Sequence, residues 1–417
     1  MTGSEPNSWL RARLGTVLGL LGLLGLPGLL CLATGCASLP SIVPDLSRRP
    51  AAAVQLVGAR GPLSAEQSKA VLAGLRNRKQ DSDIFERHLA VEEAIAGSPL
   101  TTGNQVLLLQ DGPATYRAMF AAILAARDHI HMETYILDDD EVGQRFAQAL
   151  IDKQRQGVPV HLIRDSVGTI GTPAAFFQRL IDSGIKVLEF NPLNPLLARK
   201  DWELNQRDHR KLLIVDGRTA FLGGINISSV YSGGSFSQGS RARRPAGAAA
   251  PVAPPAPAAP AVPADPTAPA PPAVPAVPEA ALAWRDTDLQ LQGPVVAELQ
   301  RLFIDTWASQ KGEALPSKNY FPTPEVAGRQ VVRAIGSSPD EPFSQIYATL
   351  LSAIGSAETS VLITNAYFAP DPKLLAALVA AAARGVDVKL ILPSQTDSWL
   401  VFHAGRGYYE PLLRAGV

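Results

Sequence analysis

The feature that most constrains the fold of this 417-residue chain is an internal repeat of apolar strands and amphipathic helices. Residues 118–136 match residues 348–368, residues 150–165 match 378–393, and residues 177–187 match 409–417, a period of about 230 residues. In each copy, short apolar runs alternate with helix-length segments that have one apolar face. The pattern predicts an α/β fold with a largely parallel sheet, built as two duplicated lobes.

The two copies differ in length. In the first copy, Val187 is followed 22 residues later by His209, whereas the second copy reaches its matching valine at Val417. We therefore expect the second lobe to be incomplete, truncated at its C-terminus before the counterpart of the His209 segment.

A Pro- and Ala-rich segment divides the first copy. Residues 245–278 hold 13 prolines in 34 residues and no aromatic residue, so they cannot build a packed core and are predicted to be disordered. Because "WRDTDLQLQGPVVAELQRLFIDTW" (284–307) predicts a further strand and helix, we interpret the segment as an insertion within lobe 1; a linker between lobes is the alternative. The expected segments are a signal peptide at 1–35, a tether and helical extension at 36–100, lobe 1 at 101–236, the insertion at 237–283, the end of lobe 1 at 284–312, and lobe 2 at 325–417.

The N-terminus has the layout of a secretory signal. Arg11 and Arg13 precede an uncharged run from Leu14 to Gly35, and small residues lead to Cys36 in "LATGCAS". This end resembles a bacterial lipobox, which predicts a lipidated Cys36 as the mature N-terminus. With Ala37 next, the expected location is the bacterial cell envelope, anchored in the outer membrane and facing the periplasm. An uncleaved membrane helix is the alternative, since the run is long enough to span a bilayer.

The stretch "NQRDHRKLLIVDGRTAFLGGINIS" (205–228) carries the candidate chemistry. It reads as a strand, a turn and a second strand, and alternation places His209 and Lys211 on the same face of the first strand. An ammonium can neutralise phosphate oxygens while a neutral imidazole attacks phosphorus. The pair therefore predicts a phosphate-binding catalytic site. The alternative is a surface turn that carries these residues by chance.

Three further positions support the pair. Gly223 and Gly224 allow close backbone approach, and the Asn226 amide can donate a hydrogen bond to a phosphoryl oxygen. Asp216 lies at the predicted turn, where it is better placed to orient other groups than to touch substrate.

These residues identify a family resemblance. "HRKLLIVD" fits the HxKxxxxD pattern of the phospholipase D superfamily, and "FLGGINIS", "WRDTDLQLQGP" and "YYEPLLRAGV" resemble its cardiolipin synthase branch. The resemblance implies two α/β lobes with the active site between them and one HKD motif from each lobe. One histidine would form a covalent phosphohistidine and the other would protonate the leaving group, with no metal or other cofactor.

Carried over by position, the resemblance makes His209, Lys211 and Asp216 the first HKD motif. Asn226, with Gly224, would hold phosphate, and Glu133 would orient a catalytic histidine. His403 does not begin a second motif, because Gly405 stands where the lysine should be. We therefore expect this chain to be inactive alone.

The resulting hypothesis is a membrane-anchored phosphatidyl transferase of cardiolipin synthase type, acting on a phosphatidylglycerol-like phospholipid. Three alternatives stay open: a phospholipase D hydrolase, an HKD nuclease working as a dimer, and a non-catalytic lipoprotein with a degenerate second lobe. Equal numbers of Lys+Arg and Asp+Glu, 38 each, disfavour a nucleic-acid partner. The sequence leaves the oligomeric state open.

Overall fold

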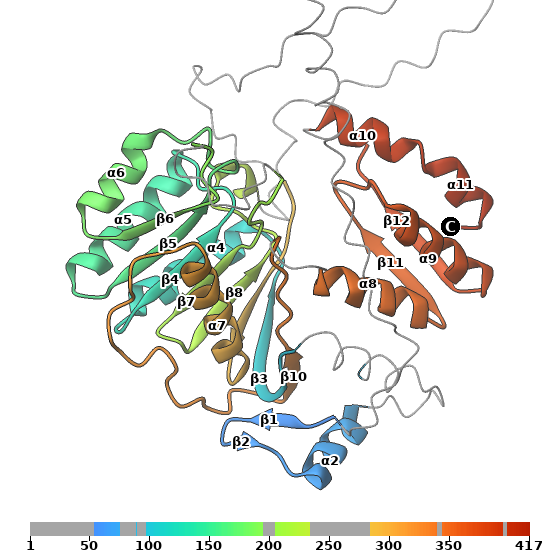
Figure 1. Cartoon of the computed structure of the whole chain (residues 1–417), viewed down its shortest axis with the longest axis horizontal. Helices are drawn as coiled ribbons and strands as arrows, with labels where there is room; N and C mark the ends of the chain where they lie inside the picture. Colours follow the sequence, from blue (N-terminus) through green and yellow to red (C-terminus); the bar gives the residue numbers. More distant parts are fainter. Residues whose placement is uncertain are drawn as a thin grey trace, which may run out of the picture. The chain divides into compact units, whose positions relative to one another are not determined.

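The computed structural model describes residues 54–75, 89, 97–194, 205–233, 284–339, 344–394 and 398–417. The described residues fall into two compact units, one within Pro50–Asp340 and one within Glu341–Val417 (Figure 1). Both units are α/β, as the sequence predicts. The signal segment, Cys36 and the Pro-rich segment lie outside the described residues.

The first unit is built on a ten-stranded mixed sheet with the order β2-β1-β3-β9-β8-β7-β4-β5-β6, and β10 also pairs with β3. The strands are β1 (Leu56–Gly58), β2 (Gly61–Pro62), β3 (Leu100–Leu109), β4 (Ile130–Thr134), β5 (Val160–Asp165), β6 (Lys186–Phe190), β7 (Leu212–Val215), β8 (Thr219–Gly223), β9 (Asp288–Gln292) and β10 (Gln330–Arg333). Strands β4, β5 and β6 are parallel, whereas β7 is antiparallel to both of its neighbours, β4 and β8.

Helices cover both faces of the central strands (Figure 1). One face packs against α4 (Gly112–Ala125), α5 (Glu141–Arg155) and α6 (Ala174–Asp182), and the other packs against α7 (Val295–Ser309). Asp111 and Asp140 cap α4 and α5 by accepting backbone N–H bonds of 2.8 and 3.0 Å in the first turn. Two further helical elements of this unit are α2 (Ala65–Leu75) and the 3₁₀ turn η1 (Ser229–Tyr231).

The segment after the Pro-rich region belongs to the first sheet. Strand β9 lies between β3 and β8, and α7 follows it onto the sheet, so residues 288–309 add the strand and helix that the sequence predicts. Strand β10 also belongs to this sheet, because it pairs with the first part of β3. Strand β9 pairs with residues 105–109 of β3, and β10 occupies most of the remainder of that long strand.

The second unit is smaller. Its strands β11 (Ser360–Thr364) and β12 (Asp387–Ile391) are parallel, and its helices are α8 (Gln345–Ser356), α9 (Pro372–Ala383), α10 (Trp399–Arg406) and α11 (Tyr409–Arg414). Apolar residues on one face of the strand pair pack against α8, α9 and α11. Among the described helices of both units, none combines the length and apolar character needed to cross a membrane.

Candidate active site

The candidate motif leads into the β7–β8 hairpin. Strand β7 begins at Leu212, so His209 and Lys211 lie on the segment that enters the strand rather than on the strand itself. At the turn, Asp216 and Gly217 have positive φ angles of 56° and 61°, and the backbone N–H of Arg218 donates to the Val215 carbonyl at 3.0 Å. A turn with two positive φ angles suits the twist of a hairpin and favours Asp-Gly at these positions.

His209 and Lys211 share the same neighbour. The Tyr135 ring, just past the end of β4, lies 4.5 Å from the His209 ring between centroids and 5.2 Å from the Lys211 ammonium. Lys211 is only 5% exposed and donates a 2.6 Å hydrogen bond to the His209 carbonyl, whereas His209 is exposed. The two side chains therefore lie on one side of the chain, with the imidazole open to solvent and the ammonium behind it.

Burial and the charge of Lys211 favour a neutral imidazole at His209. Partial burial and then the positive charge of Lys211 lower the pKa of His209, while Asp208, Asp165 and Asp286 act in the opposite direction. Burial lowers the pKa of Lys211 to about 8, again opposed by nearby carboxylates. A neutral, accessible imidazole is the form that can attack phosphorus.

The two residues that flank His209, Asp208 and Arg210, lie against the buried carboxylate of Glu133. Arg210 donates to the Glu133 carboxylate at 3.2 Å and to the Ser337 carbonyl at 2.9 Å, and it also contacts Thr306 of α7. Burial and then the negative charge of Asp208 raise the pKa of Glu133 well above its usual value. The structure thus places Glu133 against Arg210 and Asp208, and a role of Glu133 in orienting a catalytic histidine stays a prediction.

The glycine pair makes room for two aspartates that the sequence reasoning missed. A Cβ at Gly223 would lie 1.9 Å from Asp288 Oδ1, and one at Gly224 would lie 2.2 Å from Asp286 Oδ1. Asp288 is 1% exposed, and burial raises its pKa to about 7. Both aspartates belong to "WRDTDL", and the pairing of Gly223 with Asp288 across β8 and β9 brings their negative charges near enough to Lys211 to oppose the lowering of its pKa.

Asn226 lies in a network of structural hydrogen bonds. Its Oδ1 accepts the Ile136 backbone N–H at 3.0 Å, and its Nδ2 donates to the Tyr231 hydroxyl at 2.9 Å. The backbone carbonyl accepts from the Tyr116 hydroxyl at 2.7 Å. Asn226 therefore ties η1 and α4 to the end of β4, and phosphate binding by its amide stays a prediction.

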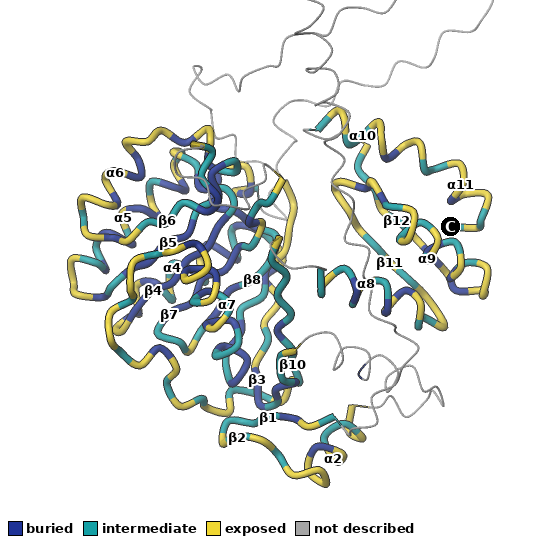
Figure 2. Tube along the Cα trace, viewed as in Figure 1, coloured by how far each residue is buried: buried dark blue, intermediate teal, exposed yellow. Residues whose placement is uncertain are grey.

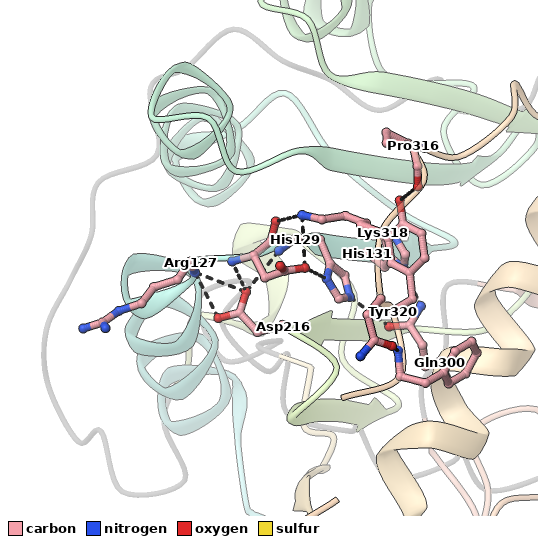
Figure 3. A network of polar contacts seen from close by, with 11 residues as sticks. Arg127, His129, His131, Asp216, Gln300, Pro316, Lys318 and Tyr320 are labelled. Carbon is pink, nitrogen blue, oxygen red and sulfur yellow. Dashed lines mark hydrogen bonds and ion pairs between the residues drawn. The ribbon is translucent and has the colours of Figure 1, made fainter. Parts of the chain in front are cut away.

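Asp216 lies at the other end of β7 from His209 and Lys211. Its carboxylate accepts backbone N–H bonds from Arg127, Asp128 and His129, the shortest being 2.7 Å (Figure 3). Its own N–H donates to the His129 carbonyl at 2.9 Å. The structure does not bring Asp216 to His209 and Lys211. Its carboxylate joins the β7–β8 hairpin to the start of β4 instead.

Comparison with known proteins shows the family of the chain. Residues 119–232 and 350–417 match the family described as "Cardiolipin synthase, PLD-like domain". The chain is 31% identical over 326 residues to the cardiolipin synthase of Geobacillus kaustophilus (strain HTA426), covering 78% of this chain and 56% of the relative. It is also 31% identical over 346 residues to cardiolipin synthase 2 of Bacillus cereus, covering 82% of this chain and 58% of the relative.

Among solved structures, the phosphatidylserine synthase of Haemophilus influenzae Rd KW20 matches with a TM-score of 0.43 and 12% identity, over 79% of this chain and 72% of that one. The chain belongs to the phospholipase D superfamily. Within that superfamily it is cardiolipin synthase-like. It spans little more than half the length of the curated relatives that it matches.

Proposed function

We propose that the protein transfers phosphatidyl groups between alcohols, with His209 as the nucleophile. The observation that carries the proposal is the exposed imidazole of His209 beside the buried ammonium of Lys211, both packed on Tyr135. Lys211 would neutralise a phosphoryl oxygen, and the lowered pKa of His209 keeps its ring able to attack. Because these relatives are named cardiolipin synthases, and cardiolipin consists of two phosphatidyl groups joined by one glycerol, we take phosphatidylglycerol as donor and acceptor.

In the proposed first step, a neutral His209 nitrogen attacks the phosphorus of phosphatidylglycerol. The bond from phosphorus to the glycerol oxygen breaks, and a general acid gives that oxygen a proton. In the second step, the hydroxyl of another phosphatidylglycerol attacks the phosphatidyl-histidine and loses its proton. The N–P bond breaks, cardiolipin forms and His209 is restored.

The proton donor is proposed to be a histidine outside the first unit. His129, His131 and His161 are at most 2% exposed and lie on the α7 side of the sheet, where no substrate oxygen can reach them. The prediction that this chain is inactive alone rests on His403, which lies in the second unit and has Gly405 where an HKD motif has its lysine. A sharp test should therefore use a leaving group that needs no acid.

Phosphatidyl-p-nitrophenol provides such a leaving group. We expect a burst of nitrophenol in proportion to the amount of chain, and a phosphatidyl mass on the peptide that contains His209. His209→Ala should abolish both, a loss of several orders of magnitude in rate. Arg218→Ala is the matched control, since Arg218 is exposed at the far end of the same hairpin and pairs with Glu325. A burst that survives His209→Ala, or the absence of any burst, would refute the assignment.

The same adduct separates transfer from hydrolysis. Phosphatidylglycerol added after the burst should convert the adduct to cardiolipin if the protein is a transferase. Conversion only to phosphatidic acid would identify a hydrolase.

A further inference from the structure

Two exposed apolar tips occur at equivalent places in the two units. In the first unit, Ile170 lies between β5 and α6 and is 73% exposed. In the second unit, Trp399 and Leu400 begin α10, which follows β12, and each is 72% exposed. Strands β5 and β12 are each paired in parallel with the preceding strand of their unit, so each tip follows the carboxyl end of the second strand of the repeat.

The fold holds Ile170 outward. Thr169 and Thr172 on either side of it are buried, and each donates a 2.6 Å hydrogen bond from its hydroxyl, to the carbonyls of Asp165 and Leu137 respectively. Because both neighbours are anchored, the exposure of Ile170 is imposed by the loop.

The Ile170 loop also borders the candidate active site. Gly168 packs so closely on Tyr135 that a Cβ there would lie 2.1 Å from the Tyr135 carbonyl oxygen. The Tyr135 ring is the one that contacts His209. Ile170 therefore projects into solvent from the loop that packs against the wall of the His209 site.

The composition of both tips suits the surface of a lipid bilayer. Residues 166–178 carry no charged side chain, so their insertion would dehydrate no charge. Tryptophan is enriched where membranes meet water, and α10 continues from Trp399 to the basic residues His403 and Arg406 with no acidic residue. Basic side chains next to an apolar tip complement anionic phospholipid headgroups.

We propose that Ile170 and the Trp399–Leu400 pair are interfacial anchors that insert into a phospholipid bilayer. The inference rests on the proposed function, because a phosphatidyl donor lies in that bilayer. Insertion of Ile170 brings the wall of the His209 site to the level of the headgroups, where the scissile phosphodiester lies.

The test places an environment-sensitive label at each tip. In the full chain with Cys31→Ser and Cys36→Ser, Ile170→Cys and Leu400→Cys are labelled separately with a nitrobenzoxadiazole group. Leu124→Cys is the matched control: Leu124 is 65% exposed, at the end of α4 that leads into the amino end of β4. Vesicles of phosphatidylglycerol and phosphatidylcholine are added, with and without a nitroxide-labelled lipid.

We expect labels at 170 and 400 to shift to the blue on vesicles and to be quenched by the nitroxide, while the label at 124 does neither. The same response is expected with His209→Ala, which separates membrane contact from catalysis. Quenching at 124 equal to that at 170 would overturn the proposal, because the N-terminal segment alone would then explain membrane proximity. A label at 170 that vesicles leave unchanged would overturn the first anchor, and the same result at 400 would overturn the second.

Discussion

Among the described residues the same pair of parallel strands occurs twice, and only one copy is covered on both faces. In the first unit, β4 pairs with β5 and sets His131 opposite His161; in the second, β11 pairs with β12 and sets Leu362 opposite Lys389. Helices cover one face of each strand pair: α4, α5 and α6 in the first unit, and α8, α9 and α11 in the second. The other face is buried in β4–β5 but exposed in β11–β12, as the colours of Figure 2 show.

Helix α7 accounts for the difference. Phe303 stacks on His131 with centroids 4.3 Å apart, and Trp307 meets the edge of His161 at 5.3 Å. In the second unit, Leu362 at the position of His131 is 70% exposed. At matching positions, a histidine is thus buried under a helix in one strand pair and a leucine is exposed to water in the other. Burial here is decided by the covering helix and not by the composition of the strands.

The largest effect on this comparison should come from removing the ring that covers His131. Phe303 is fully buried, so Phe303→Ala should destabilise the first unit by about 3–5 kcal/mol through lost burial and the cavity left behind. Hydrogen exchange measured by mass spectrometry can follow the two strand pairs separately. Peptides from β4 and β5 should lose protection, while those from β11 and β12 should keep it. Equal loss of protection in both strand pairs would show that the stability of β11–β12 also depends on Phe303.

Acid should have the next largest effect, and it should act through His161 of the first strand pair. Burial, with the charge of His129 nearby, lowers the pKa of His161 from 6.5 to about 4. Between pH 6.5 and about pH 4, the unfolded chain therefore binds a proton at His161 that the folded chain does not bind. The contribution of His161 to the free energy of unfolding is fully present above pH 6.5. It is lost as the pH falls toward 4, by about 3 kcal/mol at roughly 1.4 kcal/mol per pH unit.

Urea denaturation between pH 7 and pH 4 measures this slope. His161→Phe keeps a ring against Trp307 but removes the titrating group, so its stability should depend less on pH over this range. An unchanged slope would show that His161 is not responsible.

A smaller loss is expected from Asp216, which joins the hairpin to the start of β4. Asp216→Asn leaves one neutral oxygen for three backbone N–H groups, and should cost about 1–3 kcal/mol of stability. Because Asp216 lies at the far end of β7 from His209, the nitrophenol burst of the folded variant should stay within a few-fold of the parent. Loss of the burst at unchanged stability would make Asp216 part of the chemistry instead.

The sequence predicted what local pattern and repetition can encode. Period and alternation were enough for the α/β lobes, for the strand and helix after the Pro-rich segment, and for His209 and Lys211 on one side of the chain. They could not show that Gly223 meets Asp288, or that Glu133 meets Arg210, because these contacts depend on strand order across the sheet. Strand β10 escaped for the same reason, since it pairs with a strand more than 220 residues earlier.

The smallest effect should come from trimming the exposed face of the second pair. Leu362 and Ile391 are 70% and 67% exposed, so Leu362→Ala and Ile391→Ala remove little buried surface and should each change stability by less than about 0.5 kcal/mol. Val388 is the matched control: it is 3% exposed on the opposite face of the pair, and Val388→Ala should cost about 2 kcal/mol or more. Hydrogen exchange of the β11 and β12 peptides provides both values. If Leu362→Ala proved as costly as Val388→Ala, this face would be covered in solution, and the two strand pairs would be more alike than their exposures indicate.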